Sequence, residues 1–184
     1  MSPAEAGGKS GTGAVTSLIS SLIRDVPDYP QPGVVFKDIT PLLADGPAFA
    51  ATIAALADGY GRVDKVAGVE ARGFILAAPV AVRLGVGFVP VRKVGKLPGP
   101  THAETYQLEY GTATVEVHTD SFEPGDHVLI VDDVLATGGT AAATVELVRR
   151  SGAQVTAFSV LIELGFLGGR ASLPGVDVRA LLAL

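Results

Sequence analysis

The stretch that decides the fold of this chain is Val128-Leu-Ile-Val-Asp-Asp-Val-Leu-Ala-Thr-Gly-Gly-Thr-Ala-Ala-Ala143. Four apolar residues, 128–131, lead into two adjacent carboxylates, Asp132 and Asp133. A short run over residues 136–140 follows and opens into an alanine-rich stretch. This order predicts a buried strand, a tight loop the size of a phosphate group and the start of a helix.

The loop has the chemistry of an anion site. Amide N–H groups converge at such a loop, and the helix dipole adds partial positive charge there. Gly138 and Gly139 let the backbone approach an anion without an intervening Cβ, and Thr137 and Thr140 offer hydroxyl donors. With the carboxylates just upstream, the segment predicts a site that binds both ends of a sugar phosphate. The alternative is an ordinary βα loop of a parallel sheet.

This stretch resembles the signature of the type I phosphoribosyltransferases, in which it binds phosphoribosyl pyrophosphate (PRPP). The resemblance implies that the acid pair, Asp132 and Asp133, holds the ribose 2′- and 3′-hydroxyls. It also implies that the loop holds the 5′-phosphate through Ala136, Thr137, Gly138, Gly139 and Thr140.

Composition restricts the kind of protein. At 184 residues with 48% hydrophobic content, the chain suits one domain with a sizeable core. The mean hydropathy is +0.41, but the longest apolar run, residues 73–82, is too short to span a membrane. The net charge of −5 argues against nucleic acid as a partner, and the absence of Cys excludes disulfides. No secretory signal is recognisable, so we expect a cytoplasmic protein.

Residue patterns outline the rest of the fold. Residues 1–13 are rich in Gly, Ser and Ala and predict a disordered tail before one domain over 14–184. Apolar periodicity predicts helices over residues 14–24, 49–60, 74–84 and 140–150. Strands are expected over residues 63–69, 88–91, 128–131, 155–162 and 178–182. Strands that alternate with helices predict an α/β fold with a mainly parallel twisted sheet flanked by helices, which binds ligands beyond the carboxyl ends of its strands.

Four further segments, in the same order along the chain, resemble the adenine phosphoribosyltransferases. Residues 24–41 resemble their small N-terminal base-binding hood, 68–74 their pyrophosphate loop, 92–100 their flexible catalytic loop, and 108–111 the strand end with their catalytic glutamate. Residues 106–110 and 114–118 alternate as a hairpin beside the flexible loop. The resemblance implies that adenine and PRPP give AMP and pyrophosphate. It further implies a homodimer and Mg²⁺ held mainly by PRPP and water, with no direct protein ligand.

Positive charge is placed where a diphosphate leaving group needs it. Arg72 follows a predicted strand directly, so its guanidinium can clamp phosphate oxygens. Arg92, Lys93 and Lys96 form the densest basic cluster of this acidic chain, and the Gly and Pro residues around Lys96 suggest a lid that excludes water. A surface arginine and a solvated basic loop are the alternatives. The resemblance implies catalytic roles for Arg72, Lys96 and Glu109.

The resemblance also supplies the adenine site. It implies that Glu109 acts at the imidazole edge of adenine and that Tyr110 supports it, although a strand-end Glu is by itself more often a surface residue. In the hood it implies that adenine stacks on Phe36 and is read by main-chain groups near Val35 and Lys37. Without it, Phe36 could equally be a core residue and Tyr110 a packed aromatic.

Two other functions remain open at this point. One is an enzyme that uses the same donor with hypoxanthine or xanthine, whose 6-oxo group would need donor and acceptor exchanged in the hood. The other is a non-catalytic regulator that senses PRPP or purines and binds DNA. A regulator would need an added basic helical domain, and none is visible in this acidic chain.

Overall fold

The computed structural model describes residues 9–107 and 111–184, so Glu109 and Tyr110 lie outside the described residues. The chain divides into two compact units, Met1–Ala55 and Leu56–Leu184. The sequence analysis expected one domain over residues 14–184, with its hood formed by 24–41, and this hood segment falls within the first unit. Each unit is described by itself.

The described part of the first unit contains three helices and a two-stranded antiparallel hairpin. The hairpin lies within residues 24–41, the predicted hood, and Val26 pairs with Phe36 across it. Asp28 closes its turn, because its carboxylate accepts the Gly33 N–H at 2.8 Å. The elements are α1 (Lys9–Ser21), β1 (Arg24–Pro27), β2 (Val35–Asp38), α2 (Thr40–Ala44) and α3 (Gly46–Leu56).

Helix α1 corrects the predicted tail. It begins at Lys9, so residues 9–13, which we expected to be disordered, are helical. The apolar stripe from Val15 onwards establishes the helix, and adding residues to an existing helix is easier than starting one, even through poor helix formers such as glycine. Residues 1–8 of the predicted tail lie outside the described part of the chain.

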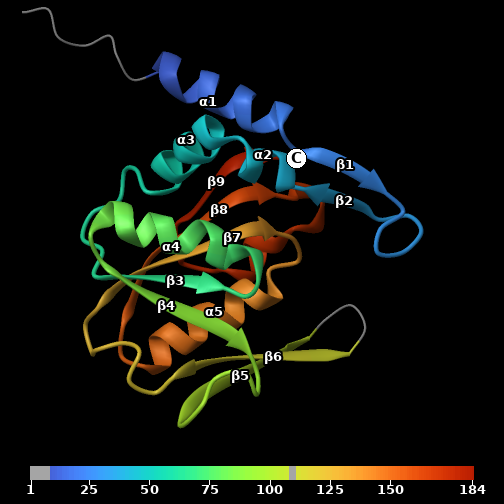
Figure 1. Ribbon diagram of the computed structural model, residues 1–184. Helices are drawn as coiled ribbons and strands as arrows, with labels where there is room; N and C mark the ends of the chain where they lie inside the picture. The colour runs from blue at the N-terminus through green and yellow to red at the C-terminus, as the bar shows by residue number, and fades with distance from the viewer. Residues whose placement is uncertain (1–8, 108–110) are drawn as a thin grey trace, which may run out of the picture. The chain divides into compact units, whose positions relative to one another are not determined.

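The second unit is built on a seven-stranded sheet with the strand order β5-β6-β4-β3-β7-β8-β9 (Figure 1). The five strands β4, β3, β7, β8 and β9 run parallel, and the β5–β6 hairpin pairs antiparallel with β4. This arrangement confirms the predicted mainly parallel α/β sheet. Its strands are β3 (Lys65–Val69), β4 (Gly87–Lys93), β5 (Thr101–Gln107), β6 (Thr112–His118), β7 (His127–Leu135), β8 (Gln154–Glu163) and β9 (Val178–Ala183).

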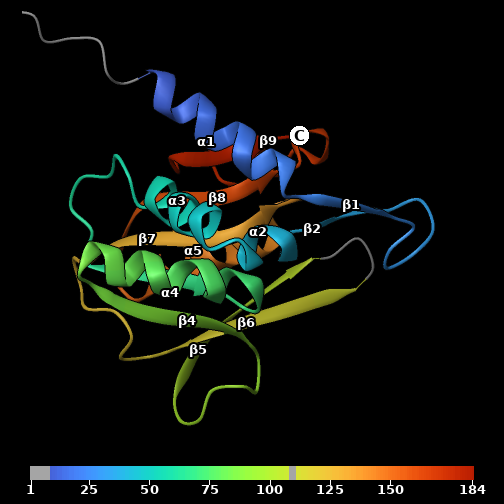
Figure 2. The same ribbon diagram turned by 45° about the horizontal axis from the view of Figure 1, so that its top comes forward.

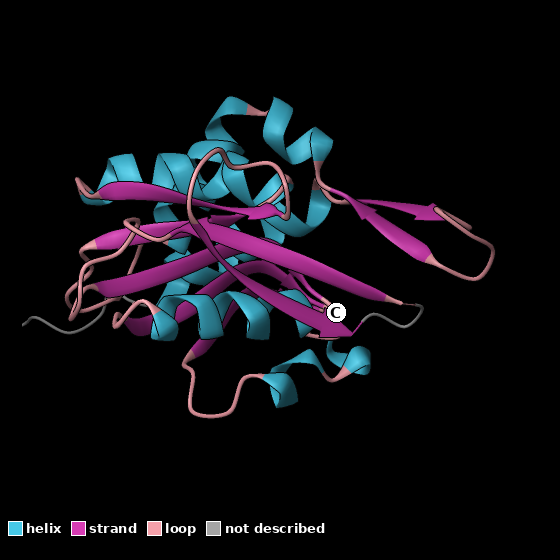
Figure 3. Cartoon of the chain, turned by 90° about the horizontal axis from the view of Figure 1, so that it is seen from below, coloured by secondary structure: helices cyan, strands magenta, loops and turns pink. Residues whose placement is uncertain are grey.

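Two helices of this unit, α4 (Arg72–Leu84) and α5 (Gly139–Arg150), cover opposite faces of the sheet (Figures 2 and 3). Helix α4 lies close on β3 because Gly68 has no side chain: a Cβ there would be 2.6 Å from the Cβ of Ala77. Residues 128–131 of β7 are fully buried, as expected for a strand covered on both faces. Among residues 9–107 and 111–184, none of the helices has the length and apolar character needed to cross a membrane.

The carboxyl ends of β3 and β7 create the edge where the site forms. These strands are parallel neighbours, with Gly68 opposite Val131, and each leads into a helix, α4 or α5. Strand β7 continues to Leu135, so Asp132 and Asp133 lie within it rather than after it. Two short 3₁₀ helices, η1 (Gly165–Leu167) and η2 (Gly169–Ser172), follow β8.

Candidate active site

The loop between β7 and α5 forms a small cavity at the start of the helix. Gly138 stands at the N-cap with φ +86°, a conformation that favours glycine, and no side chain within the described residues caps the helix. The amides of the first turn are therefore available to a ligand. The cavity has a volume of about 90 Å³ and is lined by Tyr106, Asp132 and residues 134–141. All five predicted phosphate-loop residues contribute to it.

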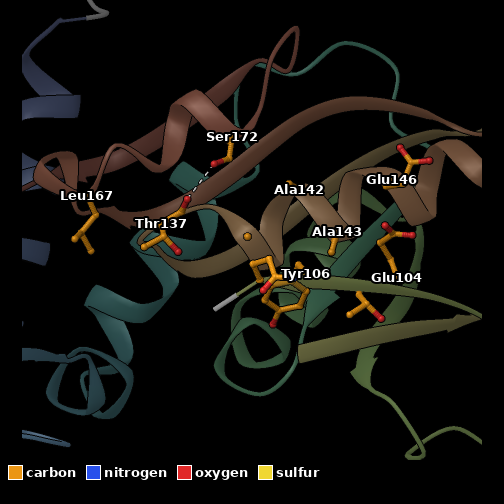
Figure 4. Close-up of a pocket in the computed structure, with 11 residues that line it drawn as sticks. Glu104, Tyr106, Thr137, Ala142, Ala143, Glu146, Leu167 and Ser172 are labelled. Carbon is orange, nitrogen blue, oxygen red and sulfur yellow. Dashed lines mark hydrogen bonds between the residues drawn. The ribbon is translucent and has the colours of Figure 1, made fainter. Parts of the chain in front are cut away.

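A second segment, far along the chain, holds this loop. The Ser172 hydroxyl donates to the Thr137 carbonyl at 3.0 Å (Figure 4). A Cβ on Gly169 would overlap the Ala136 carbonyl oxygen, and a Cβ on Gly138 would overlap the Gly169 carbonyl oxygen. The loop and η2 are thus packed backbone against backbone. Ser172 and Gly169 are not among the predicted site residues, because no local pattern marks a contact between such distant segments.

Tyr106 of β5 also contacts the loop. The Thr140 hydroxyl, predicted to face a phosphate, donates to the Tyr106 hydroxyl at 2.8 Å. The Tyr106 ring lies against Gly139, where a Cβ would be 2.9 Å from its Cδ2. Beside the loop, Tyr106 also lines a larger cavity of about 650 Å³ between β5 and α5, together with Glu104 and Glu146 (Figure 4). Tyr106 is not among the predicted site residues.

The two adjacent carboxylates have different environments. Asp132 lines the loop cavity, and its Oδ1 accepts the Asp133 N–H at 2.9 Å. Asp133 is 6% exposed, and its Oδ2 lies 2.7 Å from Nη2 of Arg72. These two charged atoms are in contact without the alignment of a hydrogen bond. The structure therefore places both predicted ribose ligands at the edge, but only Asp132 lines the cavity.

Arg72 begins helix α4, so of the predicted pyrophosphate loop, residues 68–74, only Glu70 and Ala71 lie between β3 and the helix. The N-cap is Ala71, and across the described ranges no side chain caps this helix either. A second set of first-turn amides therefore lies at the end of the strand next to β7. Close packing at the helix start requires glycine, because a Cβ on Gly73 would be 2.7 Å from Oδ1 of Asp132.

The predicted basic cluster is tied to the pyrophosphate loop by Glu70. Its Oε2 accepts the Lys93 N–H at 3.0 Å and pairs with Nε of Arg92 at 3.2 Å. The Lys93 N–H lowers the pKa of Glu70 most, ahead of the Arg92 contact, while partial burial opposes both. Arg92 also donates from Nη1 to the Lys96 carbonyl at 3.1 Å. In this structure Arg92 thus connects two loops, whereas the Lys93 and Lys96 residues are exposed.

Comparison with known proteins identifies the family. The sequence model of the phosphoribosyl transferase domain matches residues 42–169. An adenine phosphoribosyltransferase of Streptomyces coelicolor is 62% identical over 176 residues, which cover 92% of this chain and 97% of the relative. Another, from Thermobifida fusca, is 64% identical over 169 residues, which cover 91% and 96% of the two chains. The chain belongs to the adenine phosphoribosyltransferase family.

The fold agrees with solved adenine phosphoribosyltransferases. The crystal structure of the enzyme from Rhodothermus marinus matches with a TM-score of 0.90 and 51% sequence identity. The match covers 94% of this chain and 99% of the other. The resemblance drawn from five sequence segments and the type I phosphoribosyltransferase fold are thereby confirmed.

The predicted adenine-binding residues lie on β2, in the first unit. Val35 is exposed, while Phe36 and Lys37 are half-buried. The Phe36 ring meets the Tyr29 ring edge-on at 5.2 Å between centroids, and the Lys37 ammonium pairs with the Asp25 carboxylate at 2.8 Å. Glu109 and Tyr110 of the adenine phosphoribosyltransferase signature are outside the described residues.

The negative charge on Asp132 is expected to lower the stability of the fold while it supports ligand binding. Loss of water around Asp132 raises the pKa of its carboxyl well above 3.8, and the negative charge of Asp133 raises it further. A raised pKa means that the folded state prefers the protonated form. The resulting stability is complete below the unfolded pKa and is lost as the pH rises through the folded pKa.

We therefore expect Asp132→Asn to be more stable than the wild type at pH 8 and to bind PRPP more weakly. A neutral amide avoids the burial of a charge, and each kcal/mol gained should raise Tm by about 2–4 °C for a chain of this size. Thermal unfolding at pH 5 and pH 8 measures the effect, with the exposed Asp120→Asn as control. A Tm difference between variant and wild type that does not grow from pH 5 to pH 8 contradicts the prediction.

Proposed function

We propose that this chain carries out the reaction of its family at the carboxyl ends of β3 and β7. The reaction transfers the phosphoribosyl group of PRPP to adenine and gives AMP and pyrophosphate, a step of purine salvage. One observation carries the proposal: two helices without side-chain caps in the described structure start at neighbouring parallel strands, with Asp132 and Asp133 at the same edge. PRPP has the matching chemistry, with a phosphate at one end, a diphosphate at the other and a diol between them.

Binding of the donor uses the loop of β7 and α5. The amides of residues 136–140 hold the 5′-phosphate, and the dipole of α5 favours its negative charge. Asp132 accepts hydrogen bonds from the ribose hydroxyls, and Asp133 both contributes to this and orients Arg72. These interactions lie away from the carbon that reacts, so their binding energy serves to position it.

Departure of the diphosphate is assisted by positive charge. The transition state is a ribosyl cation with the diphosphate leaving, and the protein stabilises it mainly by electrostatics and positioning. Arg72 at the start of α4 and Lys96 on the lid offset the charge that develops on the leaving group, while Arg92 and Lys93 bind its outer oxygens. The lid excludes water, which would otherwise capture the ribosyl cation.

Adenine is held by the hood, and a nitrogen of its imidazole edge attacks the ribosyl carbon as the diphosphate leaves. It stacks on Phe36 and is read by main-chain groups at Val35 and Lys37. Glu109 orients the attacking nitrogen or accepts its proton, and Tyr110 positions Glu109.

Glu109→Ala is accordingly expected to lower kcat with adenine by about 10²–10⁴-fold, the usual contribution of general acid–base catalysis. The dissociation constant of PRPP should stay within about twofold, since the donor is held by other residues. Single-turnover kinetics with a separate PRPP titration measures both. Near-normal turnover of the variant would remove Glu109 from the mechanism.

Mg²⁺ is the proposed cofactor. Oxygen atoms are its preferred ligands, and Asp132 supplies a carboxylate where the ribose hydroxyls are held. In the described part of the chain, no group of three or more His, Cys, Asp or Glu side chains could hold a metal ion. As expected from the resemblance, the ion would be held mainly by PRPP and water, and it would neutralise diphosphate charge. Turnover should stop with EDTA and return with Mg²⁺.

An absorbance assay tests the function as a whole. Adenine, hypoxanthine and guanine are each supplied with PRPP and Mg²⁺, and ultraviolet absorbance follows nucleotide formation. We expect turnover with adenine alone. Turnover with hypoxanthine instead would assign a 6-oxopurine substrate, and PRPP binding without turnover of any base would favour the regulator.

A homodimer and a cytoplasmic location complete the proposal. Helix α4 exposes Ile75 and Val82, seven residues apart on one side of the helix, and we propose that they lie in the dimer contact. Light scattering should give twice the chain mass, and Val82→Asp should reduce the measured mass to that of one chain.

The proposed location is the cytoplasm. Because PRPP is a highly charged metabolite that does not cross membranes unaided, the protein should fractionate with the cytoplasm.

A further inference from the structure

Strand β6 carries a buried carboxylate that faces the lid. Glu116 is 3% exposed and stands in the middle of the β5–β6–β4 part of the sheet, opposite Arg92 on one side and Ala103 on the other. Buried carboxylates need several hydrogen-bond donors to be tolerated. The donors of Glu116 therefore reveal what it is there to hold.

Among the described residues, these donors come from the lid, residues 94–100, and from Thr101, which follows it. The backbone N–H groups of Lys96 and Leu97 both donate to Oε1 of Glu116 at 3.0 Å. The Thr101 hydroxyl donates to Oε2 at 3.2 Å. Two successive amides aimed at one carboxylate oxygen form a small anion nest. The carboxylate thus fixes the main chain at the middle of the lid and at the point where the lid enters β5.

Glu116 holds this position as an anion. Burial acts to raise the pKa of its carboxyl, but the N–H groups of Leu97 and Lys96, with the Thr101 hydroxyl, lower the pKa below its ordinary value. At neutral pH the lid is therefore bound to a full negative charge, which makes each hydrogen bond about twice as strong as a neutral one.

The carbonyl side of the Lys96 main chain is also bound. The Lys96 carbonyl accepts from Nη1 of Arg92 at 3.1 Å, and Arg92 pairs with Glu70 at 3.2 Å. The Lys96 main chain is thus bound through its N–H by Glu116 and through its carbonyl by Arg92. A continuous line of contacts runs from Glu70, in the predicted pyrophosphate loop, through Arg92 and Lys96 to Glu116.

We propose that Glu116 is a positioning residue for catalysis: it fixes the lid main chain so that the Lys96 ammonium is presented to the diphosphate. A lysine side chain has a flexible four-carbon stem, so its charge is placed only as well as its backbone is. The inference rests on the proposed role of Lys96. The competing explanation is that Glu116 merely stabilises the β5–β6 hairpin.

The test uses Glu116→Gln, which keeps the size of the side chain but turns an anion into a neutral amide. We expect kcat to fall by about 10²-fold, the scale of a misplaced catalytic group. The dissociation constant of AMP should stay within about twofold, because AMP is held by residues 136–140. Trypsin should also cut after Lys96 several-fold faster, which mass spectrometry of the fragments would reveal. A fall in kcat at unchanged AMP affinity does not follow from a general loss of stability, and neither does cleavage that accelerates after Lys96 but not at the other trypsin sites.

Glu104→Gln is the matched control. Glu104 lies on β5 of the same hairpin, and its carboxylate pairs with Arg150 of α5 instead of the lid. This variant loses a carboxylate of the same hairpin and should keep kcat and the cleavage rate within about twofold of the wild type. Thr101→Val is a milder second variant that removes only the hydroxyl donor, and it should lower kcat in the same direction if Glu116→Gln folds poorly.

A double-mutant cycle with Lys96→Ala separates this inference from the proposed function. If Glu116 acts through Lys96, Glu116→Gln should lower kcat little further in the Lys96→Ala background. A full additional loss there, normal kcat in Glu116→Gln, or a parallel fall of kcat, AMP affinity and Tm would each overturn the inference. Wild-type turnover of Lys96→Ala would overturn the role of Lys96 itself, and the inference with it.

Discussion

Replacing Arg72 with alanine should lower kcat/KM for PRPP by about 10³-fold, the scale of one lost electrostatic contact to a developing charge. The same change should destabilise the fold, because Asp133 is 6% exposed and would lose the cation 2.7 Å away. Breaking a fully buried pair costs about 3–5 kcal/mol, and the partial exposure of Arg72 reduces the expected loss to about 1–3 kcal/mol. Steady-state kinetics and thermal unfolding measure the two effects.

A second substitution separates the loss of activity from the loss of stability. In Arg72→Ala/Asp133→Asn the buried charge is gone as well, so Tm should recover towards the wild-type value while kcat/KM stays low. Arg83→Ala is the control, since Arg83 is an exposed residue in the last turn of the same helix. The assignment of Arg72 to the diphosphate fails if the single variant keeps kcat/KM within tenfold of the wild type.

Gly169→Ala should weaken binding of AMP and of PRPP by about 10²-fold, or roughly 2.7 kcal/mol. The added Cβ would overlap the Ala136 carbonyl oxygen and stand 3.1 Å from the Gly138 nitrogen. Both are backbone atoms that cannot rotate away, so the loop itself would have to move. Amides that bind a phosphate depend on converging at one point, and a shifted loop loses that convergence. Calorimetric titration with AMP measures the loss.

Gly165→Ala serves as the matched control for Gly169→Ala. Gly165 lies only four residues earlier, and a Cβ there would meet only the Leu184 carbonyl oxygen at 3.6 Å, an ordinary van der Waals distance. Its AMP affinity should stay within about twofold of the wild type. Equal affinities in the Gly165 and Gly169 variants would mean that the loop does not depend on η2.

The sequence predicted those parts of the site that follow from local order. Arg72 is the first residue of α4, separated from the end of β3 by two residues, and Gly138 comes directly before α5, so their places at the edge of a parallel sheet follow from the strand–loop–helix pattern. The predicted helix over residues 74–84 lies within α4, and the predicted helix over 140–150 lies within α5. Apolar periodicity suffices for such elements because it extends over ten or more residues.

Other parts of the site depend on contacts between distant residues. Ser172 meets Thr137 across 35 positions, and Glu116 meets Lys96 across 20. No local pattern marks such partners, since the pairing of strands brings them together. The end of β7 was misjudged for a related reason: Asp disfavours strands, but pairing of Asp132 with Val160 of β8 keeps it in one.

The close fit between the β7–α5 loop and η2 has a consequence for folding of the chain during its translation. A chain that leaves the ribosome presents its segments from the N-terminus onwards. The nucleotide cradle around Gly138 is backed by Gly169 and Ser172, which are translated more than thirty residues after it. During translation, AMP or PRPP can therefore stabilise the cradle only after Ser172 has emerged, and neither ligand can act as an early template for the sheet.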